Sequence, residues 1–277
     1  MQAEAACGHA GAHAGGDRLT ADLRALGIRP GQDLLVHCSL RRVGPVDGGA
    51  ATLLAALRAA AGPRASLVVP AQTAQNSLTS SAFLAATARL SPRERARYIA
   101  AMPGFDPATT PSSGMGALAE QVRTHPEAVR SSHPQTSFAG LGPRAAGCMA
   151  AHDLGCHLGE RSPLGWLYAA DAAALLIGVG YAACTAFHLA EYRLPGPPPL
   201  RRYTCFTSHD GGKRTRREFT DLALDDSDFG ALGTAIDPEP FVRRGRIGAA
   251  ESRLLPLRAA VDFARCWFLE HRSRAIS

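Results

Sequence analysis

The sequence predicts an α/β fold, in which a single domain has a mixed central sheet flanked by helices. Segments with the apolar period of an amphipathic helix alternate with short, continuous apolar runs that are typical of buried strands. No internal repeat and no linker-like composition divides the chain. Its 277 residues are enough to build one large domain with a substantial core.

The first half of the chain begins with a helix that places Leu19, Leu23 and Leu26 on one face. A helix at 50–62 ends at Gly62, and a helix at 92–101 has Pro92 in its first turn. The predicted elements, in chain order, are a helix at 17–28, a strand at 33–38, a helix at 50–62, a strand at 66–70 and helices at 79–90 and 92–101.

The second half opens on residues 102–116, which are too rich in Pro, Gly and Thr for a regular element and too apolar for a linker. The sequence HDGGK then predicts a tight turn between two strands, because Asp-Gly-Gly favours a hairpin. The predicted elements are a helix at 115–125, a strand at 173–180, hairpin strands at 203–207 and 214–219, and a terminal helix from residue 251 with a break near Pro256.

The composition is that of a globular protein, with 46% hydrophobic and 19% charged residues. No apolar stretch approaches the ~20 residues that cross a bilayer, so we expect no membrane association. The first sixteen residues lack the basic start and apolar block of a signal peptide, which favours a cytoplasmic protein. We expect residues 1–16 to be a disordered leader, with loose metal binding by Cys7, His9 and His13 as the alternative, and residues 17–277 to form the domain.

Charge and cysteine content exclude several classes of function. The seven cysteines show no paired spacing, which argues against a disulfide framework and a structural zinc site, and we expect no metal. The net charge of +6 comes with only 6% aromatic residues and no nucleic-acid-reading module, so we expect no nucleic-acid partner. The acidic stretch with Asp225, Asp226 and Asp228 fits a solvated loop and a site for a cationic partner equally well.

The segment GVGYAACTAFHLAEYRLPG places His188 and Glu191 three residues apart after an apolar strand. Residues at this spacing share one face of a helix, and Thr185 joins that face. The pair has three interpretations: metal ligands, a base with its orienting acid, or two surface groups. A helical zinc site needs a second His four residues away, which this segment lacks. A catalytic base fits better, because imidazole titrates near neutral pH.

Four segments carry a resemblance to a known family: LLVHCSLRRVG, RSSHPQTSFAGLG, GERSPLGWLY and GVGYAACTAFHLAE. Together and in this order they resemble the aminoglycoside 3-N-acetyltransferases, also called antibiotic N-acetyltransferases, over residues 17–230. The resemblance implies that the chain has the fold of this family and is an acyl-CoA-dependent enzyme. It implies transfer of an acetyl group from acetyl-CoA to an amine of an aminoglycoside or related antibiotic, directly within a ternary complex.

The resemblance also implies roles for individual residues. His188 matches the family's catalytic base, and Glu191 matches a glutamate near the cationic acceptor. Asp226 is expected to be the aspartate that partners the histidine, with Asp225 and Asp228 as alternatives. The resemblance also implies a set of cofactor-binding residues. Those of the coenzyme A segment are His37, Cys38, Ser39, Leu40 and Arg41, and those of the thioester channel are Ser162 and Thr185.

Departures from the family pattern leave alternatives open. Cys38 replaces a family serine, so it is a candidate acyl carrier in a double displacement. Residues 70–83 offer amides and hydroxyls instead of acids, which favours a small amine of a natural-product pathway as a rival acceptor. Resistance and biosynthetic roles stay open, as do a non-catalytic coenzyme A or amine binder of the same fold and a metalloenzyme. His133 has a structural and a substrate-binding interpretation, and the expected partners are a small amine and acyl-CoA, with a homodimer left open.

Overall fold

The computed structural model of the chain describes residues 14–209 and 212–272. At its centre lies a seven-stranded sheet in the order β3-β4-β2-β1-β5-β9-β8. Strands β2, β1 and β5 are parallel, whereas β4, β9 and β8 pair antiparallel with their neighbours, so the predicted mixed sheet is confirmed. The strands are β1 Leu34–Cys38, β2 Leu67–Pro70, β3 Val129–Arg130, β4 Phe138–Leu141, β5 Ala173–Ile177, β8 Arg243–Ile247 and β9 Ala250–Pro256.

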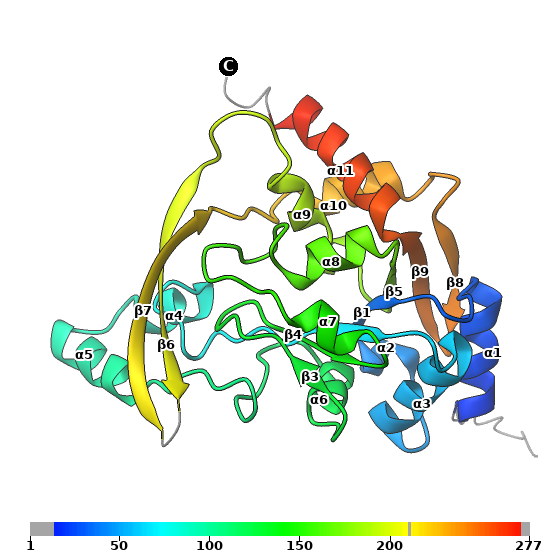
Figure 1. Cartoon of the computed structure of the whole chain (residues 1–277), viewed down its shortest axis with the longest axis horizontal. Helices are drawn as coiled ribbons and strands as arrows, with labels where there is room; N and C mark the ends of the chain where they lie inside the picture. Colours follow the sequence, from blue (N-terminus) through cyan, green and yellow to red (C-terminus); the bar gives the residue numbers. More distant parts are fainter. Residues whose placement is uncertain (1–13, 210–211, 273–277) are drawn as a thin grey trace, which may run out of the picture.

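Helices cover both faces of this sheet (Figure 1). The parallel strands are buried on both sides: Leu34 and Val36 of β1 face one core, and Leu35 faces the other. The helices are α1 Gly16–Leu26, α2 Leu40–Val43, α3 Gly49–Ala61, α4 Ser81–Thr87, α5 Pro92–Ala101, α6 Ala117–Arg123, α7 Ala145–Met149, α8 Pro163–Ala169, α9 Phe187–Glu191, α10 Phe229–Ile236 and α11 Leu257–His271, with a 3-10 turn, η1, at Tyr181–Ala183.

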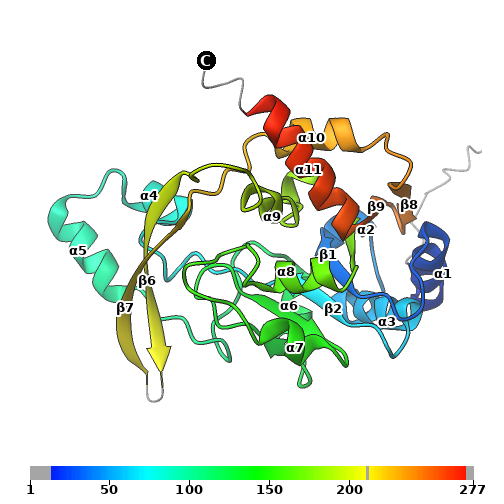
Figure 2. The same cartoon turned by 45° about the horizontal axis from the view of Figure 1, so that its top comes forward.

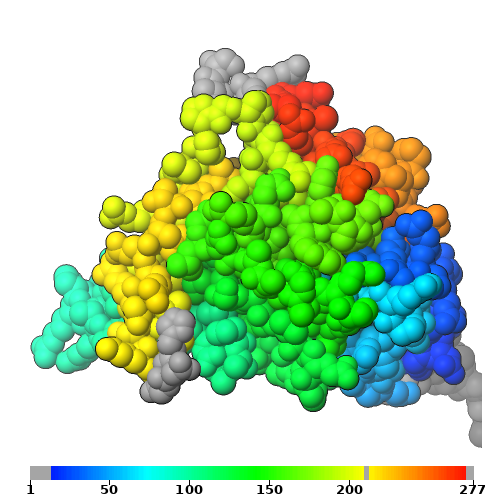
Figure 3. All heavy atoms as spheres, viewed as in Figure 1, coloured from blue at the N-terminus to red at the C-terminus, as the bar shows by residue number. Residues whose placement is uncertain are grey.

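A two-stranded hairpin of β6 Leu200–His209 and β7 Lys213–Leu222 lies beside the main sheet. Helices α4 and α5 lie next to it at the left of Figure 1, and the turned view in Figure 2 keeps these four elements together. A small apolar cluster of Phe83, Met102 and Phe206 joins the helices to the hairpin. In Figure 3, residues of the green segment around 130–170 fill the middle of the visible face and contact the hairpin.

Helix α5 begins where the sequence predicts. Ser91 caps it by accepting from the Glu94 amide, Glu94 returns a bond to the Ser91 amide, and Pro92 stands in the first turn. Helix α3 ends at Gly62, and the hairpin forms as expected.

The predicted start of the terminal helix at residue 251 is wrong. The helix, α11, begins only at Leu257, because the residues before it form β9, which pairs with β5. Within β9 the side chains of Ala250, Ser252 and Leu254 are buried, an alternation that suits a sheet.

The expected leader is described only from residue 14 onward. Residues 1–13, with Cys7, His9 and His13, lie outside the described residues. Ala14 forms a bridge with Val46, and α1 begins at Gly16. In the described part of the chain, no helix is both long and apolar enough to cross a membrane.

Candidate active site

A cavity of about 330 Å³ opens where the three parallel strands end. Parallel strands present their carboxyl ends at one edge of a sheet, where ligands commonly bind in open α/β folds. The end of β1 contributes His37, Gln72 follows β2, and Thr185 and His188 follow β5. The cavity is lined by Val36, His37, Cys38, Pro70, Gln72, Gly114, Met115, Thr136, Leu158, Val179, Ala182, Ala183, Cys184, Thr185, His188, Leu224, Asp226 and Phe229.

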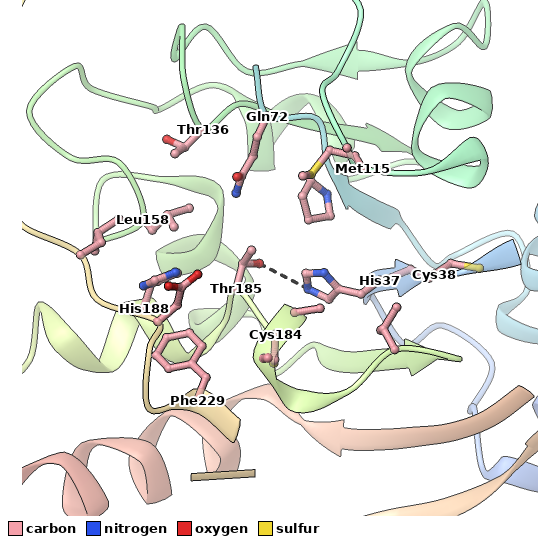
Figure 4. Close-up of a pocket in the computed structure, with 18 residues that line it drawn as sticks. His37, Cys38, Gln72, Met115, Thr136, Leu158, Cys184, Thr185, His188 and Phe229 are labelled. Carbon is pink, nitrogen blue, oxygen red and sulfur yellow. Dashed lines mark hydrogen bonds between the residues drawn. The ribbon is translucent and has the colours of Figure 1, made fainter. Parts of the chain in front are cut away.

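The chain turns sharply after β5 to bring α9 to this cavity. Gly178 has φ +62°, and a Cβ there would lie 2.8 Å from the Cβ of Arg42, so both conformation and space favour glycine. Phe187 and Leu189 are fully buried and anchor the opposite side of α9. His188 is therefore left on the side of the helix that faces the cavity, as Figure 4 shows.

His188 and Glu191 contact each other directly. The Nδ1 atom of His188 lies 2.6 Å from Oε2 of Glu191. Because an ionised carboxylate can only accept, Nδ1 carries the hydrogen and Nε2 of the neutral ring is the basic nitrogen. The His188 side chain is 12% exposed and packs against the ring of Phe229, with 4.7 Å between ring centroids. The arrangement is that of an imidazole base held by a carboxylate.

Glu191 is buried and carries two further hydrogen bonds. Its Oε1 atom accepts from the Asp225 amide at 3.1 Å and from Nη1 of Arg272 at 2.5 Å. Arg272 also forms a two-pronged ion pair with Asp228. These donors stabilise the charged form of a carboxylate that is only 4% exposed.

The three aspartates of the acidic stretch take different positions. Asp226 is exposed and lines the cavity, whereas Asp228 binds Arg272. Hydrogen bonding to Ser227 lowers the pKa of the Asp225 carboxyl, and the nearby charge of Arg272 lowers it further. The expectation that Asp226 partners the histidine needs correction, because the carboxylate hydrogen-bonded to His188 is Glu191. The spacing of three residues already placed Glu191 on that face of the helix.

Thr185 lies between two histidines in Figure 4. Its Oγ1 atom is 3.3 Å from Nε2 of His37, the residue that precedes the last position of β1. Burial lowers the pKa of His37 to about 4, so this ring is uncharged at neutral pH. The site therefore joins a neutral imidazole and a hydroxyl beside the proposed base.

Cys38 stands where the first cavity meets a second, glycine-rich groove of about 590 Å³. The two share Cys38, Gly114, Met115 and Val179. Burial raises the pKa of the Cys38 thiol to about 12, which keeps it protonated and poorly nucleophilic.

The groove receives most of the residues expected to bind coenzyme A. Ser39, Leu40 and Arg41 line it, and Arg41 is exposed at its edge. A Cβ at Gly116 would lie 3.1 Å from the Cys38 carbonyl oxygen, and φ there is +87°, so both close approach and conformation favour glycine at this wall of the groove. The expectation that Ser162 binds the cofactor needs correction. Ser162 lines neither the cavity nor the groove, is 2% exposed, and caps α8 by accepting from the Leu164 amide.

A buried cluster of histidines, His133, His152 and His157, escaped the sequence analysis. The His133 ring is fully buried, and its Nδ1 atom accepts from the backbone of Gln135 and Thr136, which supports the structural interpretation of this residue. No spacing in the sequence marks the cluster, because it forms between separate loops.

His157 ties the cluster to the hairpin, since its Nδ1 atom lies 2.6 Å from Oδ2 of Asp221 on β7. Across residues 14–209 and 212–272, no three His, Cys, Asp or Glu side chains are grouped to hold a metal ion.

Comparisons with known proteins identify the family and the fold. Residues 35–269 match the family model of aminoglycoside 3-N-acetyltransferase. YokD, an SPbeta prophage-derived aminoglycoside N(3')-acetyltransferase-like protein of Bacillus subtilis, is 35% identical over 269 residues, which cover 93% of each chain. The crystal structure of YokD gives a TM-score of 0.87 at 33% identity and covers 95% of this chain and 96% of that one.

Two further solved structures are similar and hold ligands. AAC-IIIb, in a binary complex with CoASH, gives a TM-score of 0.81 at 30% identity, covering 94% of this chain and 98% of that one. AAC-VIa, bound to sisomicin, gives a TM-score of 0.77 at 32% identity, covering 94% and 99%.

Proposed function

Because the chain belongs to the aminoglycoside 3-N-acetyltransferase family and is thus an acyl-CoA-dependent N-acetyltransferase, we propose that His188 acts as the general base when an aminoglycoside amine attacks acetyl-CoA. One observation carries the proposal. The His188 ring, bound to Glu191 through Nδ1, lines a cavity that is continuous with the groove holding Ser39 and Arg41. A base therefore stands where a thioester from one side can meet an amine from the other.

The donor is assigned to the glycine-rich groove. The similar enzyme AAC-IIIb binds CoASH. Here residues 39–41 line a groove of about 590 Å³, to which we assign the pantetheine, and the exposed Arg41 would contact phosphate. Cys38, at the junction, would lie near the thioester without carrying the acetyl group.

The acceptor is assigned to the cavity side of His188. An alkylammonium has a pKa near ~10, so the amine must lose a proton before it can attack. Asp226 is the one carboxylate among the described residues that line this cavity, and it would attract the cation. Gln72 and Thr136 supply the amide and hydroxyl groups of the opposite wall (Figure 4).

The chemistry then needs one proton relay. Once the ammonium has lost its first proton to solvent, Nε2 of His188 accepts a second proton as the neutral amine nitrogen attacks the carbonyl carbon, and negative charge collects on the carbonyl oxygen. Thr185 is placed to donate to this oxygen when the neutral His37 ring donates to the threonine hydroxyl through Nε2. Collapse of the intermediate breaks the carbon–sulfur bond, and the departing thiolate takes the proton from the imidazolium. The products are the N-acetyl amine and free coenzyme A.

The experiment is a thiol-release assay with acetyl-CoA and sisomicin, combined with mass spectrometry of the product. We expect a product heavier by one acetyl group, and initial-rate plots that intersect when both substrates are varied, as direct transfer in a ternary complex requires. Parallel lines would indicate double displacement, and an absence of turnover with any amine, despite tight coenzyme A binding, would indicate a binder.

A small amine remains a second candidate acceptor because of the walls of the cavity. A polycationic aminoglycoside is usually matched by several acids, whereas Asp226 stands among amide, hydroxyl and apolar groups here. Comparing kcat/KM for sisomicin with a panel of small monoamines separates the two acceptors.

A further inference from the structure

We propose that Arg272 is a positioning residue for the acetyl transfer: it fixes Glu191 behind the base and ties that carboxylate to the loop that carries Asp226. The inference rests on the proposed function, because it gives Arg272 a part in the proton transfer at His188. Arg272 directly follows α11 and is 81 residues along the chain from Glu191.

The contact with Glu191 is direct and charged at both ends. Nη1 of Arg272 lies 2.5 Å from Oε1 of Glu191, while Oε2 of the same carboxylate binds Nδ1 of His188. Oε1 therefore accepts from the Arg272 guanidinium and Oε2 from the His188 ring, and the two hydrogen bonds together fix the orientation of the carboxylate. Rotation of Glu191 would break both contacts, so Arg272 sets the plane in which the His188 ring is held.

The same guanidinium holds the acidic loop. Its Nε and Nη2 atoms lie 2.8 and 2.7 Å from the two oxygens of Asp228, and Nη2 also donates to the Asp225 carbonyl at 2.7 Å. Asp226 lies between these two anchors in the sequence and lines the cavity. A single side chain thus connects the base to the part of the wall that would meet the acceptor.

The guanidinium itself is well fixed. It lies over the ring of Phe268 at 3.8 Å, and its side chain is 23% exposed. Burial alone would lower the pKa of Arg272, but its hydrogen bonds to Asp228 and Glu191 outweigh burial and raise the pKa, so the charge is permanent. A cation at the C-terminal end of α11 is also favoured by the helix dipole.

The charge has a consequence for proton transfer. Arg272 is the permanently charged cation that contacts Glu191 in the described part of the chain. Without it, Glu191 would face the His188 ring uncompensated, and imidazolium would be favoured over the neutral imidazole that must accept a proton. The titratable or charged groups around His188 and Glu191 are His37, Tyr203, Asp225, Asp226, Asp228 and Arg272.

The test is the pH profile of kcat/KM for Arg272→Gln. We expect its acidic limb to move to higher pH by about one unit, the size produced by removing one charge near a titrating group. The acceptor KM should rise, because the Asp226 loop loses its anchor, while the acetyl-CoA KM stays within about twofold. Arg272→Lys keeps the charge but loses the fork to Asp228, so we expect a wild-type acidic limb with a raised acceptor KM.

Asp228→Asn is the matched control, because it weakens the loop anchor and leaves the contact between Arg272 and Glu191. It should raise the acceptor KM without moving the acidic limb upward. If Arg272→Gln does not fold, the Lys variant decides: an acidic limb displaced upward despite the retained charge would overturn the inference.

Chemical rescue gives an independent measurement. Arg272 and Glu191 border a third cavity of about 630 Å³, which residues 195–199 also line. Added guanidinium ion should therefore restore the acidic limb of Arg272→Ala. An unchanged limb in the Gln variant overturns the role of Arg272 alone, whereas a wild-type protein that acetylates no amine overturns the proposed function.

Discussion

Nδ1 of His188 lies 2.6 Å from Oε2 of Glu191, one helical turn away in α9. The contact is made within a five-residue helix whose other side is buried, so the two side chains are fixed relative to each other by local geometry. It determines the tautomer of the neutral ring and points Nε2 away from Glu191.

The charge of Glu191 is tested by Glu191→Gln. The amide keeps nearly the same shape but loses the negative charge that stabilises the imidazolium, so we expect kcat to fall by at least about tenfold. Binding of coenzyme A, measured by calorimetry, should be unchanged, because Glu191 does not line the groove. Wild-type turnover in this variant would show that the carboxylate has no role in the proton transfer.

Asp226 is expected to affect the acceptor and not the donor. Asp226→Asn should raise the KM of a cationic acceptor several-fold, the effect of losing an exposed ion pair worth about 1 kcal/mol. The acetyl-CoA KM should not change. The effect should shrink with an acceptor that carries fewer positive charges and at higher salt; a rise that is equal for all acceptors would contradict the electrostatic role.

Cys38 is expected to be dispensable for chemistry. Its thiol has a pKa raised to about 12, so Cys38→Ser should keep turnover within a few-fold of wild type. Mass spectrometry of the wild-type protein incubated with acetyl-CoA and no acceptor should show no added acetyl group at this residue. A stable adduct there would replace direct transfer with double displacement.

Acid should destabilise the fold through its buried histidines. Burial lowers the pKa of His37 and His152 to about 4 and that of His133 well below its ordinary value. An unfolded histidine takes up a proton below ~6.5, whereas these do so only near pH 4 or lower when folded. The unfolded state therefore binds more protons in this window, and stability falls as the pH falls from about 6.5 to 4.

Urea unfolding at a series of pH values measures this loss, which is on the order of 3 kcal/mol for a shift of the size seen at His152. His152→Gln should flatten the dependence. The partly exposed His125 provides the matched control, since His125→Gln should leave the slope unchanged. Equal slopes in all three proteins would rule out the buried ring as a source of acid sensitivity.

The parts of the fold that depend on local sequence were predictable. The start of α5 is marked by Ser91, Pro92 and Glu94, and the end of α3 by Gly62. Both could be predicted because helix capping depends on residues that are close in the sequence. β9 was mistaken for helix because its state depends on pairing with β5, a contact with a distant part of the chain.

The same distinction applies to the site. His188 and Glu191 share a helix and could be paired by counting residues. Arg272 reaches Glu191 from the far end of the chain, and Ser162 caps a helix instead of lining a cavity. Neither position follows from spacing, because both depend on how α8 and α11 pack on the sheet.

The central claim is tested most directly by the turnover of His188→Ala with acetyl-CoA and sisomicin. Because the imidazole supplies the base, we predict a fall in kcat of about 10² or more, with coenzyme A affinity within about twofold of wild type. A variant that folds, binds coenzyme A and acetylates sisomicin at the wild-type rate would contradict the account.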